Sequence, residues 1–270
     1  APMSGILHNG PQIAADRYAY LPALPLSLLA AGALFRLKPR TAAWLAAGLL
    51  AALAGLTIRQ VRFWRDTETL WRRVLAVNPD TLAAHNNLAA ISLNRGENET
   101  AAAHLKAVLA LDPAHGPARM NLGLTLAALG RGEEALAELR LARKLRPDKA
   151  LVPHNIGKLL YERGELEEAS VALQEAITLD PGYAEAHNYL GAVRRRQGRL
   201  ALAAESCAHA AALKPENADY HVNLGIVLLE LGRKPEALAA LGRALGLKPD
   251  HAAARAALSG GTAVPDALKN

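Results

Sequence analysis

A 34-residue period constrains the fold of this chain more than any other feature of its sequence. Prolines, glycines and alanines each recur at this step. They are Pro79, Pro113, Pro147, Pro181, Pro215 and Pro249, then Gly96, Gly130, Gly164, Gly198 and Gly232, and Ala101, Ala135, Ala169, Ala203 and Ala237. A proline cannot continue the helix before it, and a glycine permits a sharp turn between two helices. The period therefore predicts a stack of helix–turn–helix units.

The composition agrees with helices rather than sheets. Hydrophobic residues make up 51% of the 270 residues and aromatic residues only 4%. Alanine and leucine enter helices at little cost in entropy. We expect an all-α solenoid of five units, at 82–115, 116–149, 150–183, 184–217 and 218–251. A half-repeat helix over 59–81 would cap its start, and residues 252–270 would form a partial capping helix and a disordered tail.

The repeats resemble the tetratricopeptide repeat family, most clearly in "NLGLTLAALGRGEEALAELRLARKLRP". The resemblance implies a right-handed superhelix whose first helices line a concave groove, and such grooves bind peptides or extended protein segments. The first aromatic residue of the family motif is replaced here, a departure that does not threaten the fold. The replacements are His85, Arg119, Pro153, His187 and His221.

An asparagine recurs at a repeat position that faces the groove in this family. It is found at Asn87, Asn121, Asn155 and Asn223, and Tyr189 interrupts the series. Side-chain amides at regular spacing can hydrogen-bond the backbone of an extended polypeptide with little sequence preference. The alternative is that these amides bond within or between helices. The other predicted groove residues are Asn86, His154, Lys158, Tyr161 and Arg195.

Two apolar runs precede the repeats. No formal charge occurs over 18–35 or over 41–58, and each run is 18 residues long. As a helix, such a run spans about 27 Å, close to the hydrocarbon thickness of a bilayer. We therefore expect a transmembrane hairpin over 18–58, with a buried helical hairpin packed on the solenoid as the alternative. The predicted membrane-interface residues are Asp16, Arg17, Tyr18, Tyr20 and Trp44.

The charge distribution argues against a nucleic-acid-binding domain, and the single cysteine excludes a fold held together by internal disulfides. The net charge is +6, and residues 1–79 carry nine bases against three acids, so the remaining residues are neutral overall. A nucleic-acid-binding domain would instead carry a basic patch on the folded repeats. Cys207 alone excludes an internal disulfide framework. The basic connector "RLKPR" favours a cytoplasmic position for the turn between the two spans.

A second resemblance extends beyond the repeats. The segment "ADRYAYLP", the apolar hairpin and "RQVRFWRDTETLWRRVLAVNP" are similar to the C-terminal part of bacterial transmembrane and tetratricopeptide-repeat proteins related to the protein O-mannosyltransferases. The resemblance implies a polytopic glycosyltransferase-C-type domain upstream, in the bacterial inner membrane. Residues 1–17 would form a non-cytoplasmic loop, and the repeats would be periplasmic or lumenal. The chain would then be the last part of a longer protein.

No catalytic or cofactor-binding motif accompanies these features. The sequence contains no glycine-rich phosphate loop, no His-Glu-x-x-His pair and no nucleophile elbow. We therefore expect no catalytic residues, metal or cofactor in this chain, and we expect a membrane-tethered module that binds a protein or peptide. One alternative is a part of a glycosyltransferase that uses a dolichyl- or polyprenyl-phosphate sugar, with its catalytic domain upstream. Another is a scaffold for a membrane complex. The oligomeric state stays open.

Overall fold

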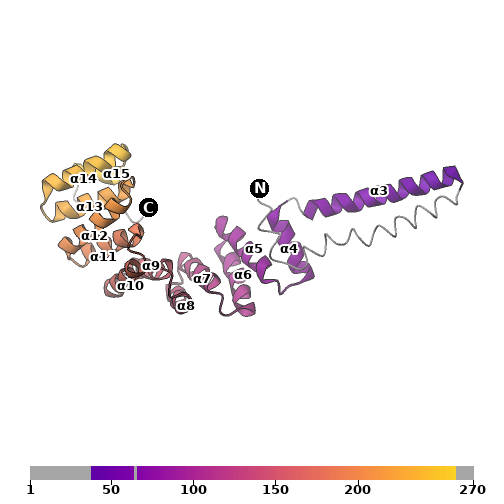
Figure 1. Cartoon of the computed structure of the whole chain (residues 1–270), viewed down its shortest axis with the longest axis horizontal. Helices are drawn as coiled ribbons and strands as arrows, with labels where there is room; N and C mark the ends of the chain where they lie inside the picture. Colours follow the sequence, from indigo (N-terminus) through magenta and orange to yellow (C-terminus); the bar gives the residue numbers. More distant parts are fainter. Residues whose placement is uncertain (1–37, 64–65, 260–270) are drawn as a thin grey trace. The chain divides into compact units, whose positions relative to one another are not determined.

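The computed structural model describes residues 38–63 and 66–259. These residues fold into α-helices joined by turns, which confirms the predicted all-α class (Figure 1). The chain divides into two compact units, Ala1–Pro113 and Ala114–Asn270.

The first unit contains four described helices. They are α3 (Pro39–Phe63), α4 (Thr67–Val77), α5 (Leu82–Asn94) and α6 (Asn98–Leu111). Asp66 caps α4, because its side chain accepts a hydrogen bond from the Thr69 amide at 2.8 Å. Trp71 of α4 is buried in a cluster with Ala84 and Leu88 of α5. The helix predicted to cap the first repeat therefore packs on it, as the register of Trp71 indicates.

Helix α3 contains the second predicted apolar run, 41–58. Large apolar side chains on it are exposed, among them Trp44 at 80%, Leu50 at 66% and Leu45 at 57%. None of the helices among residues 38–63 and 66–259 combines the length and apolar character needed to cross a membrane. The first predicted span, 18–35, and the interface residues Asp16, Arg17, Tyr18 and Tyr20 lie outside the described residues, as do residues 260–270. The transmembrane hairpin stays a prediction.

The second unit contains the remaining helices, which alternate as first and second helices of successive repeats. They are α7 (Gly116–Ala128), α8 (Gly132–Leu145), α9 (Leu151–Arg163), α10 (Leu166–Leu179), α11 (Ala184–Arg196), α12 (Leu200–Leu213), α13 (Ala218–Glu230), α14 (Lys234–Leu247) and α15 (Ala252–Leu258). Each first helix contacts its own second helix and the first helix of the next repeat, from α7 to α15. First helices therefore lie beside one another and form one face of this unit (Figure 1).

The repeated small residues set how closely the paired helices approach. The turn glycines have φ between 72° and 83°, the left-handed region that glycine enters without strain. The repeated alanines at 101, 135, 169, 203 and 237 are fully buried. At the crossing of α9 and α10, a methyl group on Gly157 would lie only 2.6 Å from Leu173 Cγ. Glycine and alanine at these positions thus permit the tight crossing.

The histidines that replace the family aromatic also have a structural role. His85, His187 and His221 each place Nε2 within 2.9–3.1 Å of a prolyl carbonyl six residues earlier, at Pro79, Pro181 and Pro215. A carbonyl oxygen only accepts, so Nε2 must carry the proton and donate. Each histidine therefore fixes the turn that enters its repeat. Pro153, at the same position of the third repeat, lies in the first turn of α9, where a missing amide donor costs little.

Candidate functional site

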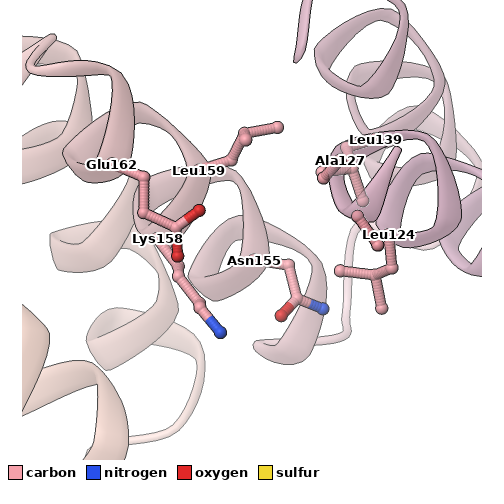
Figure 2. A pocket seen from close by; sticks show the side chains of 8 residues that line it. Leu124, Ala127, Leu139, Asn155, Lys158, Leu159 and Glu162 are labelled. Atoms are coloured by element: carbon pink, nitrogen blue, oxygen red, sulfur yellow. The ribbon is translucent and has the colours of Figure 1, made fainter. Parts of the chain in front are cut away.

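The face formed by the first helices α7, α9, α11 and α13 carries a pocket, which we call the α7–α9 pocket. Its volume is about 230 Å³. It is lined by Leu124, Ala127 and Ala128 of α7, Leu139 of α8, and Asn155, Lys158, Leu159 and Glu162 of α9 (Figure 2). The floor is apolar, and the three polar residues all come from α9.

Asn155 contributes an unused hydrogen-bond donor to this pocket. Its side chain extends from α9 toward Leu124 of α7 (Figure 2). The amide nitrogen Nδ2 is buried and has no hydrogen-bond partner among the described residues. Leaving a buried amide unsatisfied costs about 1–3 kcal/mol, so a ligand acceptor at this point would recover that cost.

The other asparagines of the predicted series do not form one continuous set of free amides. Asn87 Nδ2 donates to the Ala83 carbonyl of its own helix at 2.7 Å. Asn223 Nδ2 donates to Asn188 Oδ1 of the preceding first helix at 2.9 Å. These two amides thus bond within and between helices, which was the alternative reading. Asn121 and Asn86 are half-buried on their helices.

Tyr189, which interrupts the asparagine series, is part of an aromatic cluster between α9 and α11. Its ring centroid lies 5.4 Å from that of His154 and 6.2 Å from that of Tyr161, both in edge-on geometry. The Tyr183 ring lies 4.8 Å from the other side of His154. Lys158 Nζ lies 5.9 Å from the centroid of the half-buried Tyr189 ring. The cluster joins two repeats and places a cation beside the α7–α9 pocket.

Two residues predicted to face the groove are buried instead. His154 is 6% exposed and Tyr161 is 4% exposed, so neither offers a surface for a ligand. Burial is the main cause that lowers the pKa of His154 to about 4; the Glu185 carboxylate opposes this shift and the Lys158 ammonium adds to it. His154 is therefore neutral near pH 7. The helical period placed these residues near the groove, but the neighbouring tyrosines cover them.

Arg195, another predicted groove residue, is engaged in an ion pair between repeats. Its guanidinium lies 2.7 Å from Glu230 of α13. The adjacent Arg196 donates to the Tyr161 carbonyl at 2.9 Å and stacks over the Tyr161 ring at 4.9 Å. These arginines thus join consecutive repeats.

Sequence reasoning missed the apolar half of the pocket. Leu124, Ala127 and Leu159 are ordinary helix-forming residues, and nothing in their spacing separates a pocket wall from a core. Asn188, which holds the same repeat position as the predicted Asn86, was also missed. Within residues 38–63 and 66–259, no three histidine, cysteine or acidic side chains are grouped so as to hold a metal ion.

Three family models match the chain. One described as "TPR repeat" matches residues 157–198, and two described as "Tetratricopeptide repeat" match 92–152 with 194–259, and 59–115. No curated protein sequence matches the chain. The resemblance to proteins related to the O-mannosyltransferases finds no support in these comparisons.

Several solved structures share the fold. A structure of MamA protein is 25% identical, with 64% of this chain and 95% of that chain covered and a TM-score of 0.57. YrrB, described as a TPR protein with an unusual peptide-binding site, is 23% identical over 70% of this chain and 96% of its own, with a TM-score of 0.57. PilF of Pseudomonas aeruginosa is 24% identical over 65% of this chain and 80% of its own, with a TM-score of 0.60.

The family models together cover residues 59–152 and 157–259, well over half of the chain. The structure shows the paired helices, turn glycines and buried alanines over the same residues. The chain therefore belongs to the tetratricopeptide repeat family.

Proposed function

We propose that this chain is a protein-interaction module that binds an extended polypeptide on the first-helix face of its second unit. The observation that carries the proposal is the α7–α9 pocket, where the buried Asn155 amide has no partner. An extended peptide presents backbone carbonyls along its length, and one of them would accept from Asn155 Nδ2. The family supports the same role, because tetratricopeptide repeats bind peptide or protein partners.

The size and lining of the pocket agree with a peptide rather than a metabolite. Its volume of about 230 Å³ leaves room for one bulky side chain. Leu124, Leu139 and Leu159 supply the apolar contact. A small-molecule site would normally be larger and more enclosed. YrrB, which has the same fold, is described as having an unusual peptide-binding site.

Selection from a random peptide-display library on the purified full chain tests this proposal. Selected peptides should bind wild-type protein and lose at least about tenfold in affinity on Leu124→Asp, since a charge replaces the pocket wall. Leu141→Asp is the matched control, because Leu141 is 40% exposed on α8 and Leu124 is 39% exposed on α7. Failure to select any peptide, or an equal loss in both variants, would contradict the proposal.

We also propose that residues 18–58 attach this module to a membrane. The support is the pair of charge-free runs at 18–35 and 41–58, together with the exposed Trp44, Leu45 and Leu50 of α3. The full chain should float with lipid vesicles in a density gradient. Replacing Leu45, Leu50 and Leu53 with Asp should leave it at the bottom. If the wild-type chain does not float with the vesicles, the proposal that residues 18–58 attach it to a membrane would be overturned.

The compartment is a further part of the proposal. The basic connector at 36–40 supports a cytoplasmic turn and hence repeats on the periplasmic or lumenal side. A cysteine at position 267 should react with an impermeant reagent in intact cells. Reaction only after permeabilisation would place the repeats in the cytoplasm. A glycosyltransferase domain upstream of residue 1 is the alternative source of function, and the gene sequence before that point tests it.

A further inference from the structure

We infer that the α7–α9 pocket binds one apolar side chain of a peptide, which we call the anchor. We also infer that Lys158 forms an ion pair with an acidic side chain two residues from that anchor. The inference rests on the proposed function, because it specifies which peptides the first-helix face would bind. This mode of binding differs from that of a continuous asparagine series, which would hydrogen-bond the backbone of any extended peptide with little dependence on its sequence.

The anchor follows from the distribution of free donors on this face. Asn87 and Asn223 already donate to protein acceptors, whereas Asn155 Nδ2 is buried without one. This buried amide beside an apolar pocket fixes one residue of a peptide, with its carbonyl on Asn155 and its side chain against Leu124 and Leu159. Binding at such a point depends on what fills the pocket, so it depends on sequence.

The acidic preference follows from Lys158. Its side chain is exposed and forms no ion pair among the described residues. Its Nζ lies 5.9 Å from the centroid of the Tyr189 ring of α11. Arg195, which was also predicted to face the groove, is by contrast paired with Glu230. Lys158 is thus an ammonium that an incoming carboxylate can approach without breaking an existing pair.

We assign a spacing of two residues because it is the shortest spacing that places two side chains of an extended peptide on the same side. Side chains i and i+2 of an extended peptide point to the same side, about 6–7 Å apart. The pocket lies between α7 and α9, and the Lys158–Tyr189 contact lies between α9 and α11. Glu162, one turn further along α9, repels an acidic side chain placed on that part of the rim. Lys158 itself lines the pocket from α9, so it can contact an acidic side chain that lies on the same side of the peptide as the anchor.

Fluorescence anisotropy with three labelled nine-residue peptides tests this inference on the full chain. Each peptide is built of glycine and serine with a central leucine, followed two residues later by aspartate, serine or lysine. We expect the aspartate peptide to bind about two- to fivefold more tightly than the serine peptide, and the lysine peptide most weakly. Replacing the central leucine with serine should lower affinity at least about tenfold.

Variants of the chain separate the two contacts. Lys158→Glu should reverse the order so that the lysine peptide binds best, while Lys106→Glu, an exposed lysine on α6, should leave the order unchanged. Asn155→Ala should weaken all three leucine peptides by a similar factor of about three to ten. An order that Lys158→Glu does not change would overturn the acidic preference. Equal affinity with and without leucine would overturn the anchor.

Two further results bear on the occupant of the site. Peptides selected from the random library that lack the apolar–acidic spacing would overturn this inference while leaving the proposed function intact. If no peptide from the library binds the chain, both the proposed function and this inference would be overturned. Residues 260–270 contain Asp266 and Leu268 two residues apart, in the reverse order to the test peptides. The labelled aspartate peptide can be tested against a chain that ends at Ser259. If it binds this shorter chain more tightly than the full chain, residues 260–270 compete for the pocket, and the inference that a separate peptide occupies it would be overturned.

Discussion

Gly157 has no space for even one methyl group. A Cβ there would lie 2.6 Å from Leu173 Cγ and 3.1 Å from the Ala169 carbonyl oxygen. We predict that Gly157→Ala lowers the free energy of unfolding by about 1–3 kcal/mol, because α9 and α10 must separate to accept it. Urea denaturation followed by circular dichroism at 222 nm measures the change.

Gly246 provides the matched control for this substitution. It also lies within a helix, α14, but an added Cβ would meet nothing within 4 Å. Gly246→Ala should therefore raise the free energy of unfolding by about 0.5–1 kcal/mol, the helix-propensity difference between the two residues. If both variants lose stability equally, the tight crossing does not explain the glycine at position 157.

His154 makes the stability of the second unit depend on pH. Its pKa is about 4 in the folded chain, mainly through burial, against 6.5 for an ordinary histidine. The unfolded chain therefore binds a proton below pH 6.5 that the folded chain does not bind until about pH 4. Stability contributed by neutral His154 is present above pH 6.5 and is lost as the pH falls through this window.

The substitution His154→Leu isolates this effect. We predict that wild-type protein loses about 2 kcal/mol more than the variant between pH 7 and pH 5. Urea denaturation of both proteins at the two pH values provides the comparison. His104 and His187, whose pKa values are also lowered by burial, are present in both proteins and cancel. Parallel losses in the two proteins would show that His154 titrates normally.

At the scale of elements, the hydrogen bond between Asn188 of α11 and Asn223 of α13 joins two consecutive first helices. Asn188 is 3% exposed, so either single substitution leaves a partly buried amide without its partner. We predict that Asn188→Ala and Asn223→Ala each cost about 1–2 kcal/mol. The double variant should cost less than their sum, by about 0.5–1.5 kcal/mol, in a double-mutant cycle of urea denaturation. Strict additivity would mean that the two amides do not interact.

The helix pairs were predictable from sequence because their determinants are local and repeated. A turn glycine, a buried alanine and a proline define each unit without reference to distant residues. The role of His85, His187 and His221 was not predictable in this way. A histidine that bonds a carbonyl six residues earlier requires the turn to bring Pro181 beside His187. This geometry belongs to the folded turn rather than to either residue.

For the whole molecule, the predicted groove residues divide into some that line the α7–α9 pocket and some that neighbouring side chains cover. Asn155 and Lys158 were predicted on the groove side, and they line the α7–α9 pocket. Tyr161 and His154 share the same helix, yet rings from α11 cover them. Whether a side chain on a first helix is open or covered depends on the residue that the next repeat places against it. The 34-residue period predicts only what the repeats share, so it does not predict a contact between two particular side chains of neighbouring repeats.

The central claim is that a peptide binds at the α7–α9 pocket. Its most direct test is photo-cross-linking of a selected peptide to a reactive residue placed in that pocket. A p-benzoylphenylalanine residue replaces Leu124 in the α7–α9 pocket or, as the control, Leu141 on α8, where the exposure is equal. We predict that the labelled peptide cross-links to the chain from position 124 and not from position 141, and that excess unlabelled peptide suppresses the product. Cross-linking from position 141 alone, or equally from both, would contradict binding at this pocket.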